Sequence, residues 1–99
     1  MTDHKSFEHS ESPEEKETRE SILELDALIA EAKHEIEELK RERQETVEYN
    51  KFAKENGFQE QDIAWIDEAE KDYEEGIVQL EKQKQQFLEI AFRFDKLQL

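Results

Sequence analysis

The sequence predicts an all-α fold: an antiparallel two-helix, coiled-coil-like hairpin that completes a four-helix bundle by oligomerisation. Only two glycines and one proline occur in 99 residues, too few for a fold built from many turns. Two long segments carry apolar residues at alternating spacings of three and four, the pattern of a heptad seam. Asn56-Gly57, a pair that favours positive φ and ends helices, separates the two segments.

The first helix is expected to start at Pro13 and to run to about residue 55. Residues 1–11 are polar and aperiodic, which predicts a disordered arm, so residues 12–99 form the hairpin domain. Ser12 is a good N-cap, proline fits the first helical position, and Glu15 stands where a capping-box carboxylate reaches back. The apolar seam of this helix comprises Ile22, Leu25, Ile29, Ala32, Ile36 and Leu39.

The second helix is expected over about 60–97, after a turn at about 56–59. A turn that folds about Gly57 places Ile36 near Leu80 and Ile22 near Phe94. The same register places two polar interruptions of the seams beside specific partners: Arg43 near Asp72 and Tyr73, and Lys84 near Glu31. These two cations either set the register or extend along the surface as ordinary long side chains. Gly76, inside the helix, suggests that the neighbouring helix approaches closely there.

The charge of the chain limits its partners. Charged residues make up 42% of the sequence and the formal net charge is −14. Such a chain is unsuited to direct binding of nucleic-acid phosphates or of an anionic membrane surface. Any partner that is attracted electrostatically should be basic, although the charge also serves simply to keep the helices in solution.

The composition also bears on the cellular compartment. With no cysteine, the chain has no disulfide, thiolate zinc site or cysteine nucleophile. The first residues lack the apolar run of a signal sequence, and no stretch approaches the roughly 20 apolar residues of a membrane helix. A cytoplasmic location is therefore expected.

The C-terminal segment, FLEIAFRFDKLQL, has more apolar residues than one helix seam uses. Two helices cannot bury this surplus, which gathers where the start of the first helix meets the end of the second. The sequence therefore predicts an interface with another copy or another protein. Alternatively, the second helix bends back, or the N-terminal arm covers the patch. The expected interface residues are Leu23, Leu28, Leu88, Ile90, Phe92, Phe94, Leu97 and Leu99.

A second candidate surface is the acidic run from Glu60 to Glu75, which holds eight carboxylates, one lysine and Trp65. A tryptophan with a polar rim is typical of a binding hot spot, so this run is a candidate face for a basic partner. The run is equally explained as a solvated helix face. It also suggests an acidic mimic of nucleic acid that blocks a nucleic-acid-binding protein. The candidate residues for a basic partner are Trp65, Asp62, Asp67, Glu68 and Asp72.

Chemistry-bearing motifs are scarce. Glu31 and His34 have the E-x-x-H spacing of helical di-metal sites, and a dimer of hairpins could assemble such a site. The heptad places both residues outside the seam, so a metal-binding bundle is the less favoured alternative, and neither a metal nor a cofactor is expected. A slim hairpin also offers no pocket to tune a catalytic acid. The expected function is that of a non-enzymatic protein–protein interaction module, either an oligomeric adaptor or an inhibitor docking on a partner protein, with a homodimer or higher assembly.

Overall fold

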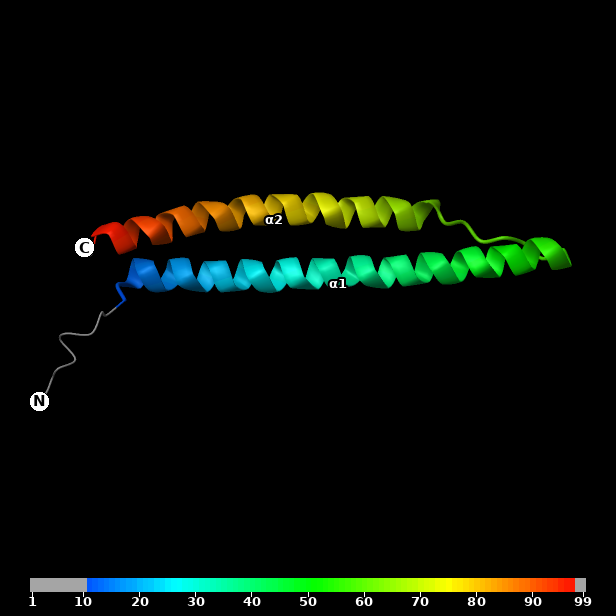
Figure 1. Cartoon of the computed structure of the whole chain (residues 1–99), viewed down its shortest axis with the longest axis horizontal. Helices are drawn as coiled ribbons and strands as arrows, with labels where there is room; N and C mark the ends of the chain where they lie inside the picture. Colours follow the sequence, from blue (N-terminus) through cyan, green and yellow to red (C-terminus); the bar gives the residue numbers. More distant parts are fainter. Residues whose placement is uncertain (1–10, 98–99) are drawn as a thin grey trace, which may run out of the picture.

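The structure, a computed structural model, describes residues 11–97. Two helices, α1 (Pro13–Asn56) and α2 (Ala64–Leu97), lie side by side and antiparallel (Figure 1), and no strand occurs in this range. The all-α two-helix hairpin predicted from the sequence is therefore confirmed. The predicted arm, except for Glu11, lies outside the described residues, and so does Leu99.

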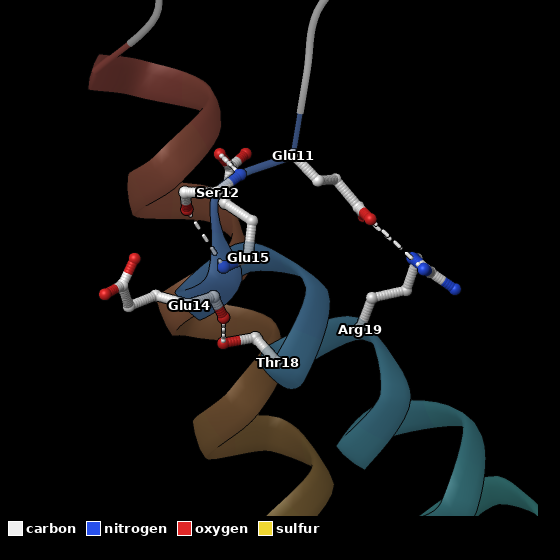
Figure 2. Close-up of polar contacts among 6 residues, drawn as sticks. All are labelled: Glu11, Ser12, Glu14, Glu15, Thr18 and Arg19. Atoms are coloured by element: carbon white, nitrogen blue, oxygen red, sulfur yellow. Dashed lines mark hydrogen bonds and ion pairs between the residues drawn. The ribbon is translucent and has the colours of Figure 1, made fainter.

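The first turn of α1 is closed by the expected capping box. The Ser12 hydroxyl accepts a hydrogen bond from the Glu15 backbone N–H at 3.2 Å, and the Ser12 N–H donates to the Glu15 carboxylate at 3.1 Å (Figure 2). One turn later, the buried Thr18 hydroxyl donates to the Glu14 carbonyl at 2.8 Å. The two Ser12–Glu15 bonds satisfy N–H groups that the helix itself leaves without partners, so α1 begins at a defined residue, and the Glu14 carbonyl gives the buried Thr18 hydroxyl an acceptor.

Glu11, which precedes α1, forms an ion pair with a residue of that helix. Its two carboxylate oxygens accept hydrogen bonds from the Arg19 guanidinium, at 2.7 Å from Nε and 3.1 Å from Nη2 (Figure 2). The hydrogen bond to Glu11, together with the negative charge of that residue, raises the pKa of Arg19 above its usual value. Arg19 therefore stays charged, and the two-point contact directs Glu11 along the outside of α1.

The core is one narrow strip between the two helices. The apolar residues with the least exposure, all below one tenth, are Leu25, Ile29, Ile36, Leu39, Ala53 and Ile66. Most of the predicted seam of the second helix is half-buried, as expected for a face that contacts a single neighbouring helix, and Tyr73 is the exposed exception. This seam comprises Ile63, Ile66, Glu70, Tyr73, Ile77, Leu80, Lys84, Phe87, Ala91 and Phe94. The heptad pattern thus identified the contacting faces of both helices.

The connection between the helices is longer than predicted. α1 ends at Gly57, whose φ of 76° lies in the left-handed region, and the Phe58 N–H donates to the Ala53 carbonyl at 2.8 Å. This is a Schellman-type end, and the accompanying apolar contact is made by the Phe52 and Phe58 rings, whose centroids lie 5.8 Å apart. The chain then runs without helix up to Ile63, so α2 begins four residues later than predicted.

Asn50 fastens this connection to the side of α1. Its side-chain Oδ1 accepts a hydrogen bond from the Gln61 N–H at 2.7 Å, and its Nδ2 donates to the Gln61 carbonyl at 2.8 Å. The connection therefore folds back along the last turns of α1, which extends past the start of α2 (Figure 1). An extended residue advances about 3.3 Å and a helical residue about 1.5 Å, so this short segment passes many residues of α1.

The longer connection displaces the helices relative to the predicted register. Lys84 pairs with Asp26 at 2.5 Å, not with Glu31, and Arg43 pairs with Asp67 at 2.8 Å, not with Asp72 or Tyr73. Each observed acidic partner stands five residues earlier in the sequence than the acid that was predicted. The prediction of these two polar contacts was wrong, because it assumed a tight turn about Gly57.

The explanation suggested for Gly76 is also wrong. A Cβ built at this position meets no atom within 4 Å, so the neighbouring helix does not approach closely there. Gly76 instead lines a shallow groove between the helices together with Leu28, Ala32, Tyr73 and Leu80. The small side chains on both helices leave this part of the hairpin incompletely packed.

Candidate interaction surfaces

The open end of the hairpin, where the start of α1 meets the end of α2, is rich in exposed apolar side chains. Leu23 is 56% exposed and Phe92 60%, and three more residues of the predicted set are exposed as well: Leu28, Leu88 and Ile90. Phe94 is half-buried. Leu97 is the last described residue of α2, with a side chain that lies outside the description. Together these side chains form the apolar end of the hairpin: Leu23, Leu28, Leu88, Ile90, Phe92 and Phe94.

The apolar end covers more than one side of the molecule. Leu23 and Phe94 line a depression between the helices together with Ile22 and Ala91. Leu88 and Phe92 line a second depression whose lining residues all come from α2, the others being Gln85, Glu89 and Arg93. Leu88 and Phe92 are four residues apart and therefore share one face of the helix. This face lies outside the contact between α1 and α2.

Leu28 belongs to the groove that also contains Gly76. Its apolar lining, with Ala32, Tyr73 and Leu80, is bordered by three acidic residues, Glu31, Glu35 and Asp72. The groove is open along its length, with a volume of about 740 Å³. It is therefore a surface on which another side chain or helix could pack, with an acidic border.

Among the residues predicted to face a basic partner, Trp65, Glu68 and Asp72 are spaced three and four residues apart and so share one face of α2. Trp65, 47% exposed, and Asp62 line a depression beside the connection, whereas Asp72 lines the groove with Leu28. Asp67 is engaged by Arg43. Glu68 is exposed and lines none of these depressions. Trp65 and Asp72 therefore border two successive hollows along one face of α2, and Asp67 stands on another side of the helix.

Sequence reasoning missed an aromatic cluster at the closed end of the hairpin. Tyr49, Phe52 and Phe58 are all exposed, and the Tyr49 and Phe52 ring centroids lie 6.4 Å apart. Tyr49 also lines the same depression as Trp65, although the two are far apart in sequence. The available signal was the phenylalanine directly after Asn56-Gly57, which is where the apolar residue of a Schellman motif stands.

Glu31 and His34, the pair with metal-ligand spacing, are both exposed on α1 and line different depressions. Over residues 11–97, no group of three or more His, Cys, Asp or Glu side chains is arranged to hold a metal ion. In the same range, neither helix has an apolar stretch long enough to cross a membrane.

Comparison with known proteins identifies no relative. No family model matches the sequence, and neither curated proteins nor solved structures show a significant similarity to it. The surfaces of the chain are therefore interpreted from their own geometry and chemistry.

Proposed function

We propose that the chain is a non-catalytic, acidic protein–protein interaction module, and that its apolar end joins a second copy to form a four-helix bundle. The observation that carries the proposal is the pair Leu88 and Phe92, exposed on one face of α2 outside the contact with α1. Burying an apolar side chain of this size contributes about 1.5–3 kcal/mol. Leaving several in water would forfeit a large part of the ~5–15 kcal/mol that stabilises a typical domain.

Two features support self-assembly in particular. The hairpin is a single layer of two helices, whereas stable helical domains pack at least two layers around a core. The chain also carries exposed Leu23 at the start of α1 and exposed Leu28 in the groove that contains Gly76, so a second hairpin finds apolar side chains on both helices. Docking of the apolar end on a different protein is the rival within this function. The absence of cysteine from the chain is compatible with a cytoplasmic setting.

The test is the molar mass in solution, measured by size-exclusion chromatography with light scattering over a range of concentrations. The wild-type chain should have a mass close to twice 11.9 kDa. The variant Leu88→Glu/Phe92→Glu should be a monomer that keeps its helical circular dichroism, because both side chains lie outside the hairpin core.

The matched control is Val78→Glu/Gln79→Glu, which adds the same two charges to exposed positions of α2 away from the apolar end. This control should keep the wild-type mass. A wild-type chain that remains monomeric at all concentrations would contradict self-assembly. The apolar end would then be assigned to a different protein partner.

A further inference from the structure

The closed end of the hairpin contains a depression of mixed aromatic and acidic character. It is formed where the connection folds back, so that residues of α1, the connection and α2 meet. Its volume is about 580 Å³ and it is open to solvent. The lining residues are Tyr49, Gln59, Glu60, Gln61, Asp62 and Trp65.

Hydrogen bonds hold the walls of this depression in place. The two bonds between the Asn50 side chain and the Gln61 backbone fix the middle of the connection against α1. Asp62 Oδ1 accepts a hydrogen bond from the Ala64 N–H at 3.0 Å, which fixes the carboxylate at the start of α2. Glu60 and Asp62 therefore belong to a segment with a defined position, not to a free loop.

The charged side chains that line the depression, Glu60 and Asp62, are both negative, and Lys51 and Lys54 of the adjacent part of α1 do not line it. Residues 55–70 contain six carboxylates and no lysine or arginine. Arg43 of α1 forms an ion pair with Asp67, and Asp67 does not line the depression. Two exposed aromatic side chains, Trp65 at 47% and Tyr49 at 40%, complete the lining.

We propose that this depression binds the cationic side chain of a lysine- or arginine-rich segment of another protein. Aromatic rings attract a cation through their quadrupole, and nearby carboxylates add charge attraction and hydrogen-bond acceptors. A purely apolar ligand would gain nothing from the charges of Glu60 and Asp62, and the equally acidic closed end of a second copy would be repelled here. This site goes beyond the proposed assembly function, since it lies at the opposite end of the hairpin from the apolar end.

Trp65 is the only tryptophan in the chain, so its fluorescence reports on this site alone. The probe is a capped peptide, Gly-Arg-Gly-Lys-Gly, titrated into the full-length chain at low ionic strength. The reference is the neutral peptide Gly-Gln-Gly-Gln-Gly. The basic peptide should give a saturable change in Trp65 emission that weakens as salt is added, and the neutral peptide should give none.

Two variants test whether the contact is local. Glu60→Gln/Asp62→Asn keeps the acceptor that caps α2 and should weaken binding about fivefold to tenfold. Tyr49→Leu should weaken binding about threefold through loss of one ring. The matched control, Glu31→Gln/Glu35→Gln, removes the same charge elsewhere. Glu35 stands fourteen residues before Tyr49 on α1, about 21 Å away, so binding should change less than twofold.

The outcomes distinguish binding at this depression from attraction of the basic peptide to the overall negative charge of the chain. Equal weakening in the site variant and in the control variant would overturn the proposal, and so would unchanged binding in Tyr49→Leu or an equal response to the neutral peptide. The measurement is independent of the assembly test. The monomeric variant Leu88→Glu/Phe92→Glu should bind the basic peptide as the wild-type chain does, so failure of one proposal leaves the other standing.

Discussion

Lys84 Nζ of α2 lies 2.5 Å from Asp26 Oδ1 of α1, and this ion pair marks the register of the hairpin. A tight turn about Gly57 would place Lys84 opposite Glu31. Asp26 and Glu31 are both exposed on α1, and either carboxylate has the charge needed to form an ion pair with Lys84. The observed pairing therefore follows from the position of the backbones, which the connection between the helices determines.

A charge exchange should reveal this register. Lys84→Glu should lower the free energy of unfolding by about 0.5–1 kcal/mol, because it replaces an attraction to Asp26 with a repulsion at a partly exposed site. Adding Asp26→Lys should restore most of the loss. Urea unfolding at fixed protein concentration measures both changes, and the differences should shrink in 1 M salt.

Glu31→Lys in the Lys84→Glu background is the control for this experiment. It creates the same pair of charges at the position that the sequence alone predicts, and it should restore little. Rescue as complete as that by Asp26→Lys would show that the helices adopt the register of a tight turn.

Asn50 is half-buried and should contribute to stability through its two hydrogen bonds to the connection. Asn50→Ala removes both hydrogen bonds to the Gln61 backbone and should cost about 1–2 kcal/mol. Asn50→Asp keeps the acceptor for the Gln61 N–H and loses the donor, so its loss should be smaller. Thermal unfolding followed by circular dichroism tests the order wild type, Asn50→Asp, Asn50→Ala. Equal stability of all three chains would mean that the connection is held by other contacts.

The two glycines should respond to alanine in opposite directions. Gly76→Ala should stabilise the chain by up to about 1 kcal/mol, since the new Cβ meets no atom and alanine favours the helix. Gly57→Ala should destabilise it by about 1–2 kcal/mol, because the φ of 76° is unfavourable for a residue with a Cβ. The midpoints of urea unfolding give both values. A loss of stability in Gly76→Ala would indicate that the groove is occupied or closed in solution.

Ile66 should be the most sensitive apolar position near the start of α2. Its side chain is 0% exposed, and Ile66→Ala should cost about 2–5 kcal/mol through lost burial and the cavity that remains. Val78→Ala, at an exposed site of the same helix, should change stability by no more than about 0.5 kcal/mol. Similar losses at the two positions would contradict the assignment of the contacting face.

The sequence predicts the helices well because their determinants are local. The capping box of Ser12 and Glu15 and the Asn56-Gly57 end each act over a few residues, and the structure shows both features where the pattern indicates them. The spacing of the seam residues also separates the contacting face from surplus apolar residues such as Leu23 and Phe92, which are exposed.

The candidate surfaces were predictable only in part. Five of the six residues of the apolar end stand outside the seam, which is a property of one helix at a time, and the sixth, Phe94, is a half-buried seam residue. Within the acidic run, spacing alone places Trp65, Glu68 and Asp72 on one face of α2, whereas the pairing of Asp67 with Arg43 depends on how the two helices lie against each other. The depression at the closed end joins Tyr49 with Trp65, and no periodicity in the sequence connects these two residues.

The sequence by itself determined that the chain is a hairpin of two helices, which faces meet and which apolar side chains are left over. The tertiary structure alone decided the register and the closed-end depression. The physical reason is the connection after Gly57, which two hydrogen bonds between the Asn50 side chain and the Gln61 backbone hold against α1. As a result α2 starts at Ala64, and the position of every later residue of α2 follows from that start. Heptad spacing repeats along both helices, and so it leaves open which repeat of one helix faces which repeat of the other.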